Sequence, residues 1–209
     1  MIELRVAIVG WMLSVCALCS AAPPREPSVV PAWVGAVRAA ITAGIWSDAD
    51  ALLEPHLSSP TQEFFALCLR AELAVKRGEY DQAASDLRLA LGREPRGAPD
   101  PWRAWARYEL GYLTSQYVGS PQQALEFYDA ALAINPRHYK ALQHRGHVHA
   151  GLGRLEAACA DLRRALACWP SHVEPEQRAQ SARPLVERLR SRGFDAEAAA
   201  LEQSELGPV

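Results

Sequence analysis

Apolar residues recur three or four positions apart along most of the chain, with polar and charged residues between them. Phe64, Leu67, Ala71 and Ala74 form one such row, and Gly78 follows it. This spacing places the apolar side chains on one face of an α-helix. Alternating apolar and polar runs of strand length are missing. The pattern therefore predicts an all-α protein built from amphipathic helices.

The helical rows are organised by a recurring glycine and alanine. A glycine is followed five residues later by an alanine at Gly44/Ala49, Gly78/Ala83, Gly119/Ala124, Gly153/Ala158 and Gly193/Ala198. Successive glycines are 34, 41, 34 and 40 residues apart, and a proline follows each of the first four pairs at Pro60, Pro95, Pro136 and Pro170. We expect two short loop insertions to account for the longer intervals. The pattern predicts helix pairs at about 30–60, 61–95, 101–136, 139–170 and 174–206.

The unit is most complete in residues 139–170. Gly146 lies where two helices would cross closely, Gly153 ends the first helix, Ala158 lies on the second, and Pro170 closes the unit. This segment resembles a tetratricopeptide repeat. The resemblance implies an α-solenoid of about five antiparallel helix pairs, wound as a right-handed superhelix, whose first helices line a concave groove for a peptide or another protein.

The N-terminal part has a different composition from the repeats. Residues 6–22 form a short apolar run, and four prolines lie within residues 23–31. A run of this length that ends in small residues is typical of a secretory signal peptide, with cleavage near Ala21. We therefore expect a signal or anchor segment at 1–22, a proline-rich linker at 23–29, and the helical-repeat domain at 30–209.

Two alternatives to simple export stay open. The apolar segment could remain as an N-terminal anchor, or Cys16 or Cys19 could be lipidated as in bacterial lipoproteins. The residues before Cys16 resemble a lipidation signal, although Val15 stands where a small residue is usual. Each hypothesis places the chain in the periplasm or cell envelope and leaves membrane contact to the N-terminal segment alone.

Composition narrows the class of function. The 209 residues are 49% hydrophobic, enough for a sizeable core, and the formal net charge is −2 with both signs interspersed. Neither a nucleic-acid groove nor a polybasic membrane patch is expected. Lys76 and Lys140 are the only lysines, and we attribute the preference for arginine to a GC-rich coding sequence.

Three cysteines lie beyond the N-terminal segment, at positions 68, 159 and 168. Cys159 and Cys168 are nine residues apart on one predicted helix, about 13 Å by the helical rise, which is too far for a disulfide. We expect all three to be small buried residues between helices.

Helical phase indicates which residues line the expected groove. Gly111 and Thr114, like Gly146 and His149, are expected to face the second helix of their pair, which leaves other positions towards the open side. These are Arg38, Glu72, Lys76, Trp105, Tyr108, Glu109, Tyr112, Gln116, Lys140, Gln143, His144 and His147. Their mixture of aromatic and polar side chains is typical of a binding surface. Trp105 and Tyr108 have an alternative placement, packed against the loop at 96–101.

The resemblance also excludes one kind of partner. Chaperone-binding members of the family hold a C-terminal carboxylate with lysine, arginine and asparagine on their inner helices. The matching positions here carry Cys68, Glu72, Tyr108, Tyr112, Gln143 and His147. We therefore expect no chaperone-tail site of that kind.

Metal binding and catalysis find little support. His144 and His147 are three residues apart and share a helix face with His138 nearby, but their helix carries no carboxylate and two histidines make an incomplete site. No P-loop, nucleophile elbow, zinc-protease motif or dinucleotide turn occurs. We expect no catalytic residue, no metal and no cofactor.

Two hypotheses about function follow. The first is a protein-interaction scaffold of the bacterial envelope, whose groove binds a peptide or partner protein. The second is a lipid-anchored structural factor, similar to the tetratricopeptide lipoproteins that help pilus or secretin assembly.

Overall fold

A computed structural model describes residues 30–60, 62–169, 183–184, 186–187, 189–191 and 193–205. Within these ranges the chain is helical, and the turns between helices are short. The elements are α2 (Trp33–Ala43), α3 (Trp46–Leu57), α4 (Glu63–Arg77), α5 (Tyr80–Gly92), α6 (Asp100–Leu113), η1 (Thr114–Val118), α7 (Pro121–Ile134), α8 (Tyr139–Gly151), α9 (Leu155–Ala167) and α11 (Asp195–Glu205). No strand occurs in the ranges given, and the predicted all-α class is confirmed.

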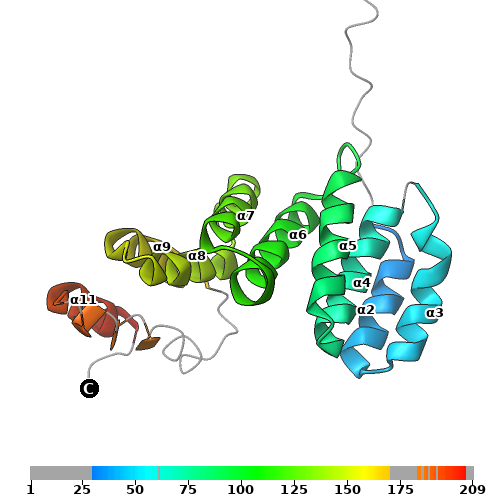
Figure 1. The fold of residues 1–209 in the computed structure, drawn as a ribbon. Coiled ribbons are helices and arrows are strands. Elements are labelled where there is room, and N and C mark those ends of the chain that lie inside the picture. The colour runs from blue at the N-terminus through cyan, green and yellow to red at the C-terminus, as the bar shows by residue number, and fades with distance from the viewer. Residues whose placement is uncertain are drawn as a thin grey trace, which may run out of the picture.

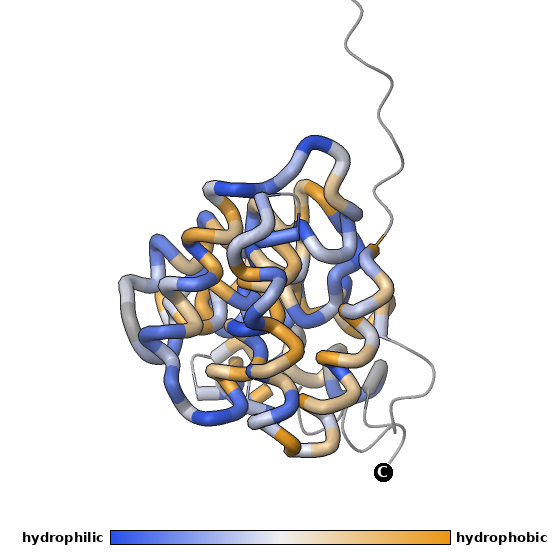
Figure 2. Tube along the Cα trace, turned by 90° about the vertical axis from the view of Figure 1, so that its right-hand side faces the viewer, coloured by the Kyte–Doolittle hydropathy of each residue, from blue (hydrophilic) through white to orange (hydrophobic). Residues whose placement is uncertain are grey.

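The helices follow one another as adjacent pairs, from α2 and α3 at one end of the molecule to α11 at the other (Figure 1). The two helices of a pair make the most extensive contacts, and the second helix of each pair then packs on the first helix of the next. Hydrophobic and hydrophilic residues are interspersed along the chain when the stack is viewed from its end (Figure 2). This arrangement is the predicted α-solenoid.

Glycines end several of the first helices as predicted. Gly44, Gly78 and Gly153 have φ values of 74°, 79° and 77°, in the left-handed region that favours glycine. The backbone N–H of Gly78 donates to the carbonyls of Ala74 and Val75, which would otherwise be unpaired at the end of α4. These positions fix where the chain reverses within a pair.

Gly119 behaves differently from the other turn glycines. Its φ is −147° and its ψ is −164°, which is extended backbone. The difference arises because α6 continues into a π-helical turn, η1, closed by the Gly119 N–H donating to the Thr114 carbonyl at 3.0 Å. Ser120 then caps α7 by accepting a hydrogen bond from the Gln123 N–H, and Pro121 is the first residue of that helix.

The π-turn accommodates one extra residue in the third pair. Gly146 precedes Gly153 by seven residues, whereas Gly111 precedes Gly119 by eight. An i→i+5 turn is the usual way in which a helix takes up a one-residue insertion. The expected loop insertion in the 41-residue interval is thus shared between this turn and the seven-residue connection 93–99.

A buried ion pair joins the two helices of the second and fourth pairs. Arg70 of α4 donates two hydrogen bonds to the Asp86 carboxylate of α5, at 2.8 and 2.7 Å. Arg145 of α8 makes the same contact with Asp161 of α9, at 2.7 and 2.5 Å. Both aspartates are buried, so the bidentate arginine compensates for their lost hydration.

The third pair replaces this ion pair with apolar residues. Leu110 precedes the crossing-point Gly111 as Arg145 precedes Gly146, and Phe127 follows Ala124 by three residues as Asp161 follows Ala158. A Cβ added at Gly111 would lie 3.2 Å from the Phe127 Cβ and 2.9 Å from the Tyr128 ring, so α6 and α7 approach closely only because the residue is glycine.

Two hydrophobic cores meet at α6. One contains residues of α2 to α6, and the other contains residues of α6 to α11. Leu110 of α6 belongs to the first core and Tyr108 to the second, while Trp105 packs against both. The last pair joins the second core through Val186, Leu189 and Ala198.

Pro99 occupies the N-cap position of α6, so Asp100 is the first residue of that helix. Pro55 lies inside α3, which continues to Leu57. One expectation about the cysteines is corrected. Cys68 and Cys159 are buried as expected, but Cys168 is only half-buried, because it lies beyond the end of α9.

No helix in the described ranges is long and apolar enough to cross a membrane. The predicted signal or anchor segment 1–22 and linker 23–29, with Cys16 and Cys19, lie outside those ranges.

The contribution of the Arg70–Asp86 ion pair to stability can be tested by replacing both residues with the apolar residues that occupy the matching positions of the third pair. We expect Arg70→Leu to lower the free energy of unfolding by about 3 kcal/mol, because it leaves the buried Asp86 carboxylate with only the Gln82 amide as partner. The double variant Arg70→Leu/Asp86→Phe should recover most of this loss, since it removes the charge as well. Urea unfolding measures both; a double variant no more stable than the single one would contradict this account.

Candidate functional site

The first helices of the pairs carry the side chains that were predicted to line the groove, and we call this set the first-helix face. It is formed by α2, α4, α6 with η1, and α8. Its residues are Arg38, Glu72, Lys76, Trp105, Glu109, Tyr112, Gln116, Lys140, Gln143, His144 and His147. Arg38, Lys76, Gln116 and Lys140 are exposed, and the others are half-buried. A surface with several half-buried polar and aromatic groups differs from a solvated one, because part of their hydration is already lost.

Charged contacts connect the first helices to one another. Arg38 of α2 lies 3.6 Å from the Glu72 carboxylate of α4, and its guanidinium is 4.8 Å from the centre of the Trp102 ring of α6. Glu72 and Lys76 of α4 both act electrostatically on Glu109 of α6. The structure therefore brings the predicted residues of α2, α4 and α6 into one charged row.

Glu109 is the most perturbed acid of this row. Burial raises the pKa of its carboxyl to about 7, while Lys140, and more weakly Lys76, pull that pKa downwards. Neither a hydrogen bond nor an ion pair reaches Glu109 from the residues that the structure places. Its carboxylate is thus half-buried without a direct partner.

Aromatic and histidine rings form the other half of the face. The rings of Tyr112 of α6 and His144 of α8 are 5.0 Å apart in an edge-to-face arrangement, and His147 lies 6.3 Å from His144. Burial lowers the pKa of His144 to about 4, helped by His147 and Lys140. His144 is therefore neutral near pH 7 and behaves as a ring rather than as a cation.

Tyr108 was expected on the open side, and this expectation is wrong. Its side chain is only 6% exposed, and its ring lies 4.9 Å from His138 and 6.3 Å from Tyr128. The His138 Nδ1 caps α8 by accepting from the Ala141 N–H, which sets the start of α8 over Tyr108. Tyr108 is therefore a core residue between pairs, and burial raises the pKa of its hydroxyl.

Trp105 is half-buried, with its ring 6.3 Å from Trp102 in an edge-to-face contact. Phe65 of α4 packs edge-on against Trp102 at 5.1 Å. Trp102, which the sequence analysis did not single out, is thus the buried base on which Arg38 and Trp105 lie.

A pocket of about 280 Å³ opens between η1, the start of α7 and the end of α8. Its lining consists of Ser115, Gln116, Pro121, His144, His147, Val148, Gly151 and Leu152. Sequence reasoning assigned Gln116, His144 and His147 to the groove but missed the pocket, because the π-turn that lines it has no simple sequence signal.

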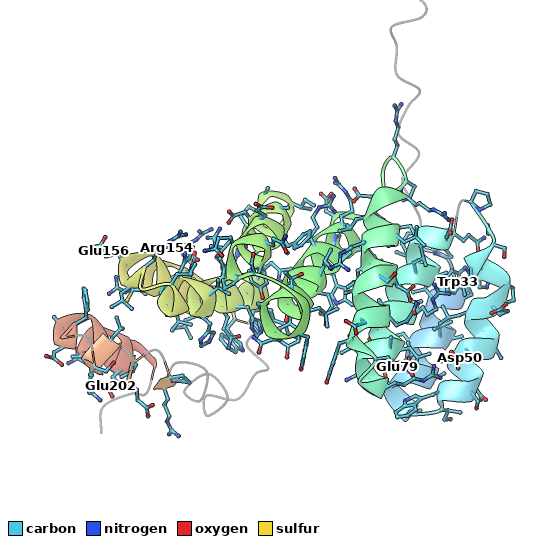
Figure 3. All side chains as sticks on the ribbon, viewed as in Figure 1. Trp33, Asp50, Glu79, Arg154, Glu156 and Glu202 are labelled. Carbon is cyan, nitrogen blue, oxygen red and sulfur yellow. The ribbon has the colours of Figure 1, made fainter. Side chains whose placement is uncertain are left out.

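A second, more open hollow of about 500 Å³ lies beside the α4–α5 turn. Glu79, labelled in Figure 3, marks this turn. Next to it the rings of Tyr80 and Tyr117 stack at 3.8 Å, which ties η1 to the second pair.

Metal ligation is not favoured by the geometry. No group of three or more histidine, cysteine, aspartate or glutamate side chains with metal-binding geometry occurs in the placed part of the chain. His149 lies 4.0 Å from the Asp161 carboxylate, towards the second helix as expected, and not beside His144.

Helix pairs of this geometry, stacked so that their first helices share a face, define a helical-repeat solenoid. Residues 139–167 match the model of the tetratricopeptide repeat. The "FK506-binding protein-like" proteins of Mus musculus and Homo sapiens are each 39% identical over 93 residues, which are 44% of this chain and 24% of theirs. The chain thus spans about a quarter of the length of these relatives.

Solved structures extend the likeness to most of the chain. MamA superposes with a TM-score of 0.64 at 16% identity, covering 81% of this chain and 92% of its own. YrrB, described as a TPR protein with an unusual peptide-binding site, gives 0.62 at 16% identity, covering 83% of both chains. PilW, a type IV pilus biogenesis factor, gives 0.64 at 22% identity, covering 85% and 77%. At such identities the likeness concerns the fold, and the match to the tetratricopeptide-repeat model covers residues 139–167.

The raised pKa of Glu109 predicts a pH-dependent effect on stability. An acid whose pKa is raised on folding contributes stability at low pH that is lost as the pH rises through about 7. We expect Glu109→Gln to stabilise the protein by about 2 kcal/mol more at about pH 8 than at about pH 5, where the acid is still protonated in the folded protein. Thermal unfolding at both pH values measures this, with Glu126→Gln on the exposed side of α7 as control; equal effects at both pH values would contradict it.

Proposed function

We propose that the protein is a non-enzymatic interaction scaffold whose first-helix face binds an extended peptide or a segment of a partner protein. The observation that carries this proposal is the set of exposed and half-buried charged and aromatic side chains on α2, α4, α6 and α8. Folding has already removed part of the hydration of these groups, so a ligand that supplies contacts there gains more than it would on a fully solvated surface.

The fold relatives support the same class of function. YrrB has a peptide-binding site according to its description, and the first TPR of Spaghetti, at a TM-score of 0.51, is bound to the HSP90 peptide SRMEEVD. The positions that would grip such a chaperone tail carry Tyr108, Tyr112 and His147 among others, and Tyr108 is buried. The partner proposed here is therefore not a chaperone tail held in that way.

Site-specific photo-crosslinking in the source cells tests the proposed face. A photoreactive phenylalanine analogue at Gln143 of α8 or at Gln116 of η1 should yield a discrete adduct with a partner, because both positions flank His144. The same analogue at Ala133, exposed on the second helix α7, is the matched control. Adducts formed at Ala133 but not at Gln143 or Gln116 would place the partner elsewhere.

The second candidate keeps the same fold but assigns it to envelope assembly. In this proposal the chain is exported to the periplasm or cell envelope of a bacterium, and lipid on Cys16 or Cys19 anchors it as a structural factor for a pilus or secretin. It is supported by the apolar run at residues 6–22 and by the fold it shares with PilW.

Metabolic labelling with palmitate separates the two candidates. The assembly-factor hypothesis predicts incorporation that is lost in Cys16→Ala or in Cys19→Ala, because only a cysteine at the cleavage site receives the lipid. Cys168→Ala, which changes a half-buried cysteine of the repeat domain, is the control. Absence of label in the wild-type chain would leave the unanchored scaffold.

A further inference from the structure

The two lysines of the chain lie on either side of Glu109. Lys76 is in the last turn of α4 and Lys140 is at the start of α8, while Glu109 lies on α6 between these two helices. Both lysines act electrostatically on the Glu109 carboxyl. Three consecutive first helices thus contribute a cation, an acid and a cation to one stretch of the first-helix face.

These lysines have no partner of their own in the described ranges. Neither forms an ion pair there, and both are exposed. Many of the arginines, in contrast, pair with carboxylates of neighbouring segments, as Arg70 does with Asp86 and Arg107 with Glu94. The positive charge that is available to a ligand on this part of the face is therefore concentrated on Lys76 and Lys140.

Glu109 controls how much of that charge a ligand meets. The titratable groups that face it are Glu72 and Lys76 from α4, Lys140 from α8, and the hydroxyls of Tyr108 and Tyr128 from α6 and α7. Arg38 is paired with Glu72 and contributes little net charge. Ionised Glu109 offsets one of the two lysines, whereas protonated Glu109 leaves both uncompensated.

Building on the proposed function, we propose that the ligand of the first-helix face is an acidic peptide segment whose carboxylates pair with Lys76 and Lys140. Glu109 acts as a built-in competitor for these lysines, so the segment binds more tightly when Glu109 is protonated. We infer an acidic ligand because its charge is complementary to that of the two lysines. We infer competition because Glu109 is half-buried between these two cations, neither of which has another partner among the described residues. Because burial sets the pKa of Glu109 at about 7, the change falls near neutral pH.

Peptide selection with the full-length chain provides the test. A random library of about twelve-residue peptides without histidine is displayed and selected at about pH 6, and the dissociation constant of the best binder is then measured at about pH 6 and about pH 8. We expect selected peptides rich in aspartate and glutamate, with binding roughly threefold to tenfold weaker at the higher pH. Peptide carboxylates stay ionised at both pH values, so the difference comes from the protein.

Variants locate the source of the pH dependence. Glu109→Gln should bind equally well at both pH values, with the affinity that the wild type has at about pH 6, whereas His147→Gln should keep the pH dependence. Lys76→Gln and Lys140→Gln should each weaken binding at both pH values, and Arg163→Gln, an equal loss of charge on the exposed side of α9, should not.

The outcomes distinguish this inference from the proposed function. Peptides without acidic residues, or a pH dependence that persists in Glu109→Gln, would overturn the competitor proposal while leaving a peptide-binding face. Failure to select any peptide whose binding responds to first-helix variants would overturn both.

Discussion

The close approach of the two helices in each pair is the constraint on which the rest of the structure depends. At Gly146 a Cβ atom would lie 3.2 Å from the Ala158 carbonyl oxygen, and at Gly111 it would meet the Tyr128 ring. In the second and fourth pairs an arginine of the first helix also reaches a buried aspartate of the second, and in the third pair apolar side chains take the place of this ion pair. A pair held in this way buries only part of its apolar surface, so it must stack on its neighbours, and the first helices are left side by side.

The third pair departs from this arrangement in two linked ways. Leu110 and Phe127 replace the ion pair, and the extra residue between Gly111 and Gly119 is taken up as a π-helical turn. α6 contributes to both cores, Tyr117 of the π-turn stacks on Tyr80, and the π-turn lines the pocket beside His144. Irregular turns of this kind often occur at functional sites. The least regular repeat is therefore the one that shapes the middle of the first-helix face.

Much of the fold could be predicted from the sequence, because the turns that need a left-handed residue and the helix crossings that need a small one place glycine and alanine at regular intervals along the chain. Gly44, Gly78 and Gly153 are in that conformation, and the all-α solenoid is as expected. Individual exposure was harder to predict. Tyr108 and Tyr112 are four residues apart with similar helical phase, yet one is buried and the other half-buried, because the start of α8 covers only the first. Helical phase identifies a face but cannot specify how far the next helix extends across it.

The distribution of basic residues shows why composition alone was a poor guide to chemistry. An excess of arginine over lysine can be explained by coding bias, and that explanation treats the two residues as equivalent. In the structure Arg70 and Arg145 use the planar guanidinium to hold a buried carboxylate with two parallel hydrogen bonds, which an ammonium group cannot do. Lys76 and Lys140 have no such structural task and lie at the surface beside Glu109. Whatever set the ratio of arginine to lysine, the two residue types occupy different positions. Arginine, with its planar guanidinium, makes the contacts between helices, and the flexible lysines lie at the surface, where a ligand can reach them.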